Sequence, residues 1–366
     1  MARPMTVDVA APSDEITVSC YINEIPPFAE IELARLYGHI HSSLAFFKTS
    51  RPTEYVSTYV ACQHGRPITL LIFRCRKGTV DVYNEMISIS QAEIERFACY
   101  VFEHFSEVQV ISFKAIQSDV QRTRFPFQRY NAKENWVIDL PATPEEYTSR
   151  LGKATRDNVR RYRKRLVRDH PSFDYRFHVK NTIDGQQVRE IIELSKARIS
   201  AQKKKFGIDD DEAQRIIRLA RECGFVNMMQ IGGRLCAGTV SYYVGSDYLA
   251  EVVAHDSRYD NYWLGTLCYY LTICESITRG AKKFHMGGGR NEYKTRLLGV
   301  RQDMDCLEIY RSYGHMALNL RRVAKTALYG AVRKIKVWLL EREKSVITQS
   351  VFRSLYVLRR LAGKEA

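Results

Sequence analysis

Residues 248–299 read YLAEVVAHDSRYDNYWLGTLCYYLTICESITRGAKKFHMGGGRNEYKTRLLG. The pattern predicts a strand at 248–255, a loop at 256–264, a helix that opens at Gly265, and a second strand at 282–286 that leads into a glycine run. If the two strands are adjacent and parallel, the helix start lies at the carboxyl end of the sheet, where open α/β sheets bind ligands. The free N–H groups of a helix's first turn attract anions. This stretch therefore predicts a ligand-binding crevice.

The same order of elements occurs in both halves of the chain: helix, strands joined by tight turns, helix, strand. The interval from Gly65 to Gly78 equals the interval from Gly232 to Gly245, and each of these glycines marks a turn between strand-like runs. Such self-similarity indicates two copies of one α/β unit. The long loop and the glycine run occur in the second copy, so we expect the site there.

The expected fold class is α/β (α+β), built from tandem units that each have a mixed central sheet. Residues 1–140 form the first unit, which we expect to lack a cofactor site. Residues 141–312 form the second unit with the crevice, and residues 313–366 form a basic, amphipathic helical tail. A chain of 366 residues is long enough for two cores of this kind.

The composition limits the kinds of partner and the cellular compartment that we expect for this protein. The formal net charge is +15 and the pI is about 9.4, which favours phosphates, nucleic acid or an anionic membrane as partners. The nine cysteines include no Cys-x-x-Cys pair, so we expect free thiols and no metal site. The first residues lack the pattern of a signal peptide, and no run is apolar enough to span a membrane. We therefore expect a cytoplasmic protein, peripheral at the inner face of the membrane if its tail binds lipid.

Two basic stretches stand out. Residues 153–168 carry many Lys and Arg residues with Asp157 as their acidic exception. This helix either contacts phosphates or presents an ordinary solvated face. In the tail, apolar positions from Leu320 to Leu339 recur at helical spacing among basic residues. Residues 316–363 are expected either to lie on an anionic membrane surface or to pack on the body with a wet basic face.

Three segments carry a resemblance to a known family. Residues 151–161 (LGKATRDNVRR) resemble the opening signature of the CelD/BcsL-type acyltransferases, which belong to the GNAT superfamily and are close in fold to the FemAB peptidyltransferases. Residues 264–267 (LGTL) resemble the family's turn into its cofactor-binding helix. Residues 284–290 (FHMGGGR), followed by Tyr293-Lys294, resemble its late strand and exit loop. The resemblance spans about residues 145–300, and it departs from the family at His285 and Arg290, where many relatives have acidic residues.

The resemblance implies acyl transfer from acetyl-CoA or another acyl-CoA to an amine, by direct attack on the thioester. The implied cofactor-binding residues are the strand backbone, the helix start with a nearby cation, and the glycine run: Val252, Val253, Ala254, Arg258, Gly265, Thr266, Leu267, Gly287, Gly288 and Gly289. A base must take the proton of the amine, and the leaving thiolate needs a proton. The candidates are Glu251, His255, Asp256 and His285 as base, and Tyr293 and Lys294 as acid.

Each candidate also has a purely structural interpretation. Glu251 could face solvent from its strand, His255 and Asp256 could cap a loop, and His285 could be a satisfied core histidine. Three functions are consistent with the sequence. The first is N-acylation of an amino sugar, nucleotide- or lipid-linked, in bacterial surface polysaccharide or cell-envelope synthesis. The second is a FemAB-like aminoacyltransferase that uses aminoacyl-tRNA. The third is a non-catalytic GNAT-fold module that binds nucleic acid or membrane.

Overall fold

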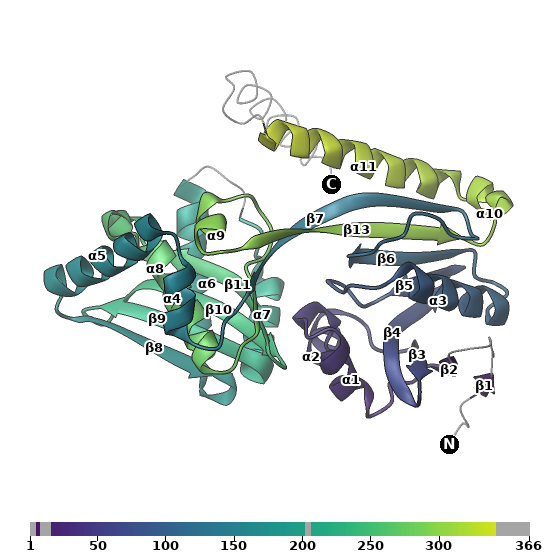
Figure 1. The fold of residues 1–366 in the computed structure, drawn as a ribbon, viewed down its shortest axis with the longest axis horizontal. Helices are drawn as coiled ribbons and strands as arrows, with labels where there is room; N and C mark the ends of the chain where they lie inside the picture. The colour runs from purple at the N-terminus through teal and green to yellow at the C-terminus, as the bar shows by residue number, and fades with distance from the viewer. Residues whose placement is uncertain (1–4, 8–15, 202–205, 342–366) are drawn as a thin grey trace.

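The computed structural model describes residues 5–7, 16–201 and 206–341 (Figure 1). The first half contains these elements: β1 (Met5–Val7), β2 (Ile16–Tyr21), α1 (Ala29–Leu36), η1 (Ile40–Ser42), α2 (Leu44–Ser50), β3 (Val56–Gln63), β4 (Arg66–Arg76), β5 (Thr79–Val82), α3 (Gln91–His104), β6 (Val110–Ile116) and β7 (Phe127–Asp139). The second half contains these: α4 (Pro144–Arg150), α5 (Lys153–Asp169), β8 (Phe173–Val179), η2 (Lys180–Thr182), α6 (Gly185–Ala201), α7 (Asp210–Cys223), β9 (Gly224–Ile231), β10 (Arg234–Val244), β11 (Asp247–His255), η3 (Ser257–Tyr262), α8 (Leu264–Thr278), β12 (Lys283–His285), α9 (Glu292–Arg296) and β13 (Val300–Tyr310). Two helices follow: α10 (Tyr313–Leu318) and α11 (Leu320–Glu341).

The two halves repeat one topology, which confirms the predicted fold class. In the first, β2 to β5 form an antiparallel meander and β6 joins β5 in parallel after α3. In the second, β8 to β11 form the meander and β12 joins β11 in parallel after α8. A helix between parallel strands provides the crossover that such a pair requires.

The two sheets are continuous with each other. The described strands form one 13-stranded sheet in which β13 and β7 lie between β6 of the first unit and β12 of the second. β7 belongs to the first half by sequence but pairs with β12, whereas β13 follows the second half but pairs with β6. The long β7–β13 pair therefore joins the units through main-chain hydrogen bonds (Figure 1).

A common hydrophobic core also joins the units. Buried side chains of α1 and α2, such as Leu33 and Phe47, belong to the same cluster as Ile191 of α6 and Ile216 of α7. The sequence pattern predicts one helix over residues 29–44, but the chain breaks at Gly38, whose φ is +60°, a left-handed conformation that favours glycine. The break lets α1 and α2 both reach this shared core.

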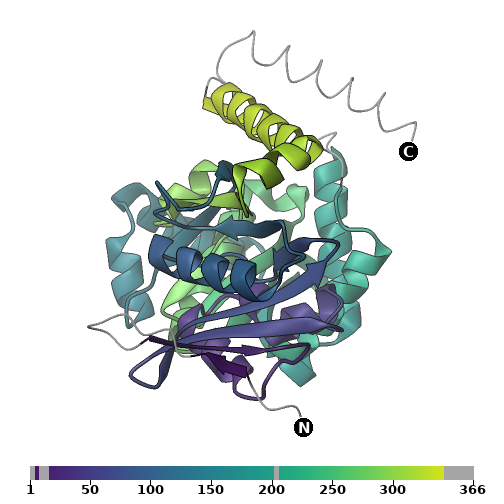
Figure 2. The ribbon, with the colours of Figure 1, turned by 90° about the vertical axis from the view of Figure 1, so that its right-hand side faces the viewer.

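The C-terminal helix α11 lies across β7 and above the sheet, at the upper surface in both ribbon views (Figure 1, Figure 2). Its inward positions include Thr326 and Gly330, which are buried, and Val323 and Val337, which are half-buried. A Cβ on Gly330 would lie 3.1 Å from Cβ of Tyr130, so glycine permits the close approach of helix and strand. Arg322 bonds Glu308 at 2.8 Å, and Arg333 bonds Asn131 at 3.0 Å. Among the described helices, none is long and apolar enough to cross a membrane.

Candidate functional site

The site is created where two parallel strands separate. β12 pairs with β11 over Asp247 to Leu249. β12 ends at His285, whereas β11 continues to His255, so from Ala250 onward β11 loses its neighbour on this side. The sheet order places no other strand in the gap within the described residues. The separation opens a wedge whose walls are a strand edge, the start of α8 and the glycine run.

This wedge holds a cavity of about 410 Å³, which is in the usual range for ligand sites. The predicted residues that line it are Glu251, Val252, Val253, His255, Gly265, Thr266, Gly287, Gly288, Tyr293 and Lys294. The structure thus brings together residues that are more than forty positions apart in the chain. It adds a wall that the sequence interpretation missed, formed by Ser195, Arg198 and Ile199 of α6 and by residues 206–208.

The start of α8 is an anion-binding feature of the cavity. Trp263, the N-cap residue, has φ +57° and provides no side-chain cap. Gly265 and Thr266 therefore present first-turn amides to the cavity that they line. Leu267 lies behind them: its side chain is buried, and its N–H already donates to the Trp263 carbonyl at 3.0 Å.

Arg198 is the arginine of this cavity. Its Nη2 donates to the Val253 carbonyl at 3.4 Å, while its Nε is buried and has no hydrogen-bond partner among the described residues. A buried unpaired donor is costly, and an anionic ligand would satisfy it. Arg258, the cation expected from the sequence, lies elsewhere: its side chain is 73% exposed, it pairs with Asp256, and it does not line the cavity.

Lys294 secures the glycine run. Its side chain is buried on α9, and its Nζ donates to the carbonyls of Gly287 at 3.0 Å and Gly288 at 2.5 Å. Gly287 and Gly289 have φ values of +68° and +91°, which explains why the run requires glycine. Burial lowers the pKa of Lys294 to about 8, near the value of an ordinary thiol. An ammonium has three N–H donors, so one remains for a group in the cavity.

Tyr293 lies beside Lys294 at the same wall. Its ring centroid is 5.2 Å from that of Tyr269 in α8, with which it shares a side-chain hydrogen bond. Burial raises the pKa of Tyr293, so the phenol stays protonated at neutral pH. It can donate a proton or a hydrogen bond, but it releases a proton less readily than Lys294.

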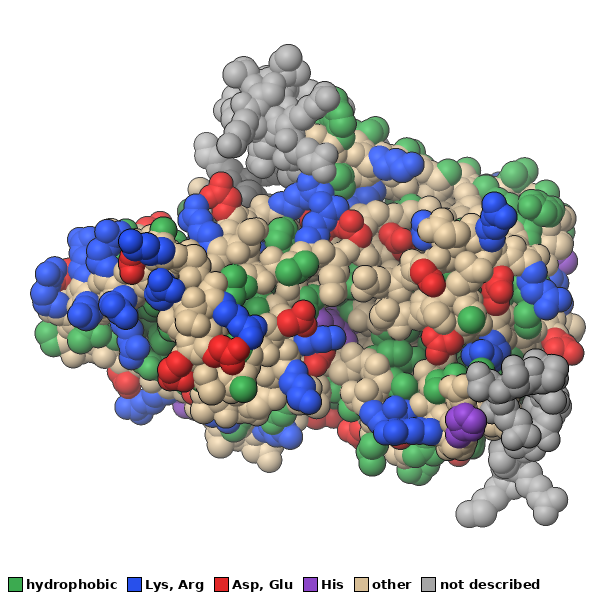
Figure 3. Space-filling model, in the orientation of Figure 1, with side chains coloured by type: hydrophobic (Ala, Val, Ile, Leu, Met, Phe, Trp, Pro, Cys, Tyr) green, Lys and Arg blue, Asp and Glu red, His purple; other side chains and the backbone are tan. Residues whose placement is uncertain are grey.

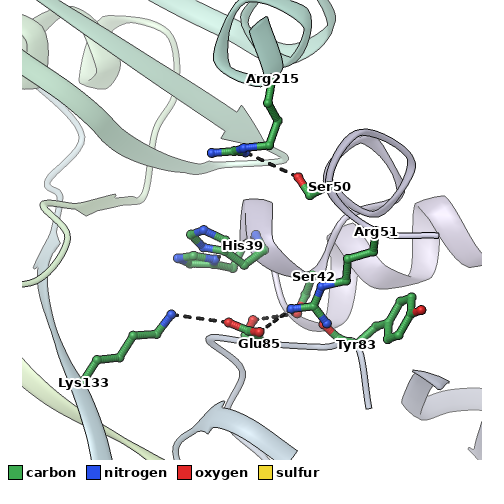
Figure 4. A network of polar contacts seen from close by, with 9 residues as sticks. His39, Ser42, Ser50, Arg51, Tyr83, Glu85, Lys133 and Arg215 are labelled. Carbon is green, nitrogen blue, oxygen red and sulfur yellow. Dashed lines mark hydrogen bonds and ion pairs between the residues drawn. The ribbon is translucent and has the colours of Figure 1, made fainter. Parts of the chain in front are cut away.

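Glu251 is the carboxylate of the cavity. Burial raises its pKa above the ordinary value, which makes it a stronger base, and Arg215 of α7 lies 3.5 Å away. Arg215 is held by Glu212 and by Ser50 of the first unit at 3.4 Å (Figure 4). The first unit therefore helps to position the arginine beside Glu251.

His255 has a structural partner on each side. Its Nε2 lies 2.9 Å from Oδ1 of Asp260, and burial lowers the pKa of the ring. A Cβ on Gly265 would come within 2.6 Å of Nδ1 of His255. Contact with His255 is therefore sufficient reason for glycine at the helix start, whatever ligand approaches it.

That contact gives a stability prediction. Gly265→Ala is expected to lower the free energy of unfolding by about 1–3 kcal/mol, because the new methyl group overlaps the imidazole. Removing the ring in a Gly265→Ala/His255→Ala double variant should recover most of the loss that Gly265→Ala adds, measured by urea unfolding against His255→Ala alone. Equal destabilisation in both backgrounds would show that the contact does not matter.

Several predicted residues lie away from the cavity. Asp256 accepts hydrogen bonds from Arg258, which lower its pKa, and it caps η3. Ala254 is fully buried in the shared core. His285 is also buried: its Nδ1 lies 3.0 Å from Asn135 Nδ2 and its Nε2 lies 3.4 Å from Asp247, as expected of a satisfied core histidine.

A second cavity, of about 380 Å³, adjoins the first. The two share Ala250, Glu251, Gly287 and Gly288, so Glu251 and the glycine run lie between them. Gly289, the last of the predicted cofactor-binding residues, lines the second cavity. This cavity is strongly basic: its cations are Lys133, Arg290, Arg333 and Lys336.

Both units and α11 build the second cavity. His41 comes from the first unit, where Lys133 of β7 also pairs with Glu85 at 3.4 Å (Figure 4). Glu134 is buried and pairs with Arg290 at 2.9 Å and with Arg333 at 3.3 Å. The sequence interpretation missed this cavity, because its residues come from six separate segments of the chain. Within the described residues, no cluster of His, Cys, Asp or Glu side chains is suited to hold a metal ion.

Comparison with known proteins agrees with this geometry. Residues 153–295 match the family model described as an acetyltransferase (GNAT) domain. The solved structure of FemX is 9% identical, and the match covers 81% of this chain and 98% of that chain with a TM-score of 0.59. A tandem GNAT protein from the clavulanic acid biosynthesis pathway is 10% identical over 80% of this chain and 98% of its own, with a TM-score of 0.38. A search of curated protein sequences gives no match. The fold is therefore similar to that of FemX, and residues 153–295 are similar to an acetyltransferase (GNAT) domain.

Proposed function

We propose that the protein is an acyl-CoA-dependent N-acyltransferase of the CelD/BcsL type that acylates a phosphate-bearing amine, such as a nucleotide- or lipid-linked amino sugar of the bacterial cell envelope. The observation that carries the proposal is the pair of adjoining cavities with Glu251 and the glycine run between them. Each cavity offers a different anion-binding surface. A donor and an acceptor that enter from opposite sides would meet at these shared residues.

The first cavity suits an acyl-CoA. The first-turn amides of α8 and the unsatisfied Nε of Arg198 fit the pyrophosphate. The unpaired edge of β11 from Ala250 onward offers main-chain hydrogen bonds to the pantetheine arm, and its amides fit a developing oxyanion on the thioester. For a cavity of this size, acetyl is the simplest acyl group to propose.

Glu251, between the cavities, and Tyr293 and Lys294, in the first cavity, can complete the proton transfers. The amine nitrogen attacks the thioester carbon, and the C–N bond forms as the C–S bond breaks. Glu251 takes the proton that the amine loses, which its raised pKa favours. Lys294 gives a proton to the departing thiolate, because its pKa of about 8 is close to that of the thiol. Tyr293 lies near enough to hold the sulfur by a hydrogen bond.

One pair of variants tests the donor site. We expect Arg198→Gln to weaken acetyl-CoA binding by about 10–100-fold, as loss of a charge-assisted hydrogen bond to phosphate implies. Arg258→Gln should bind as the wild type does, since Arg258 is exposed and paired with Asp256. Isothermal titration with acetyl-CoA measures both. Loss of binding in Arg258→Gln with retention in Arg198→Gln would place the pyrophosphate at the loop and contradict the proposal, and no binding by wild type would reject an acyl-CoA donor.

A second candidate function has one observation in its favour. Helix α5 buries Thr155, Val159 and Leu166 and leaves most of its arginines and lysines on the surface, where they form the blue cluster of Figure 3. Such a surface suits the phosphates of an aminoacyl-tRNA, the donor of a FemAB-like aminoacyltransferase. Salt-sensitive tRNA binding that is lost in Arg160→Gln/Lys164→Gln, without acetyl-CoA binding by wild type, would favour this alternative.

A further inference from the structure

Helix α11 leaves several large apolar side chains exposed although it packs on the body. Its inward positions include Thr326, Gly330 and Arg333, which are buried or half-buried against β7. The opposite side carries Leu320, Leu328, Val332 and Ile335, which are 66%, 61%, 54% and 56% exposed, and ends at Leu339, which is buried. We call these four residues the outer stripe. Figure 3 shows hydrophobic side chains along the upper edge of the molecule, where Figure 1 places α11.

This orientation is unusual for a helix of a monomeric soluble protein. Amphipathic helices normally turn their apolar face to the core, because burying it supplies most of their tertiary stabilisation. In α11, ion pairs such as Arg322 with Glu308 hold the opposite face on the body. The helix packs on the body and carries exposed basic residues, as one of the two sequence interpretations expects, but it also exposes the four apolar residues of the outer stripe. An outward apolar stripe on a rigidly held helix indicates an interaction surface.

The charges around the outer stripe identify the partner. Residues 320–340 contain no acidic residue, and their basic residues are Arg321, Arg322, Lys325, Arg333, Lys334 and Lys336. Lys325 and Lys334 are exposed on either flank of the stripe. An apolar stripe bordered by cations matches the boundary between acyl chains and anionic headgroups, whereas the like charges of a second copy of this basic face would repel it.

We propose that α11 docks the protein on an anionic membrane, with the outer stripe inserted at the level of the acyl chains. The helix also links this surface to the second cavity, because Arg333 and Lys336 line that cavity. The cavity's basic wall would then lie about one helix diameter, roughly 10 Å, below the headgroups. If the proposed acyl transfer holds, the acceptor is an amine on a lipid-linked phosphate that enters this cavity from the membrane.

Vesicle flotation of the full-length protein tests the docking. Wild type is expected to float with phosphatidylcholine vesicles that contain phosphatidylglycerol but not with phosphatidylcholine alone, and high salt should release it. Leu328→Gln/Ile335→Gln should weaken binding by about tenfold or more, because two apolar side chains no longer enter the interface. The matched control is Ile22→Gln/Ile31→Gln, which removes two exposed apolar residues, 52% and 71% exposed, far from α11 and should bind like wild type.

If something other than a membrane covers the outer stripe, these measurements give different results. No flotation with anionic vesicles, or equal flotation of the stripe variant, overturns the proposal. Lower thermal stability of the stripe variant without vesicle binding would assign the stripe to residues 342–366, which lie outside the described residues. A dimer in light scattering that the stripe variant loses would assign it to a second copy. Acetyl-CoA titration of the same variants reports separately on the first cavity, so failure of docking and failure of the proposed function are distinguishable.

Discussion

Replacing Lys294 by methionine is expected to lower kcat by about 10²–10³-fold, the usual cost of removing a preorganised donor from an acyl-transfer site. Methionine fills the buried volume but has no N–H donor and no proton to give. The carbonyls of Gly287 and Gly288 would lose their partner, and the departing thiolate would leave without an acid. Steady-state acyl transfer to an amine acceptor, with thiol release followed by a chromogenic disulfide, measures the change.

The control for Lys294 lies on the same short helix. Arg296 is exposed and pairs with Glu292 at 2.6 Å, so Arg296→Met should retain activity. The acetyl-CoA affinity of Lys294→Met distinguishes a chemical role of Lys294 from collapse of the glycine run. If the role is chemical, kcat changes and the affinity stays within about threefold of wild type. If Lys294→Met keeps wild-type kcat, Lys294 is only a structural support.

The second large effect is expected for Glu251→Gln, which should reduce kcat by about 10²–10⁴-fold because the amide cannot accept the proton of the amine. Burial raises the pKa of Glu251 above its ordinary value, so activity should increase with pH as the carboxylate forms. Activity should decrease again near pH 8, as Lys294 loses its proton. The wild-type profile is thus a bell, whose rising limb should vanish in Glu251→Gln.

Glu212→Gln is the matched control for Glu251. Glu212 also pairs with Arg215, at 2.5 Å, but lines neither cavity. This variant should keep the bell-shaped profile and most of the rate. If both variants lose activity equally, the position of Arg215 matters and Glu251 is not the base. If Glu251→Gln retains the rising limb, another group takes the proton.

The sequence predicted the elements around the first cavity because each has a local signal. Alternating apolar residues mark β11, the uncapped turn before Gly265 opens α8, and the glycine run ends β12. The capping box of Ser90 and Glu93 at the start of α3 is a local pattern of the same kind. Local patterns of this kind depend only on neighbouring residues, so contacts with distant segments do not change them.

Other features gave no local signal. β7 and β13 carry many charged residues, such as Glu134 and Arg301, and resemble surface loops in sequence. They become strands because they pair with each other, and each also pairs with a strand of one flanking unit. These partners are distant in the sequence. Arg198 is one basic residue among several on α6, and nothing nearby distinguishes it as the residue that faces the cavity.

By itself, the sequence determined that the second half carries a strand, an open helix start and a glycine-rich exit in the order that builds a GNAT-type crevice. It also determined that the C-terminal helix is amphipathic and basic. Only the tertiary structure decided that Glu251 lies between two cavities, that Arg198 rather than Arg258 is the arginine of the first cavity, and that the helix exposes four of its large apolar residues. The physical reason is that periodicity fixes which residues share a face, whereas contacts between distant segments fix where that face points.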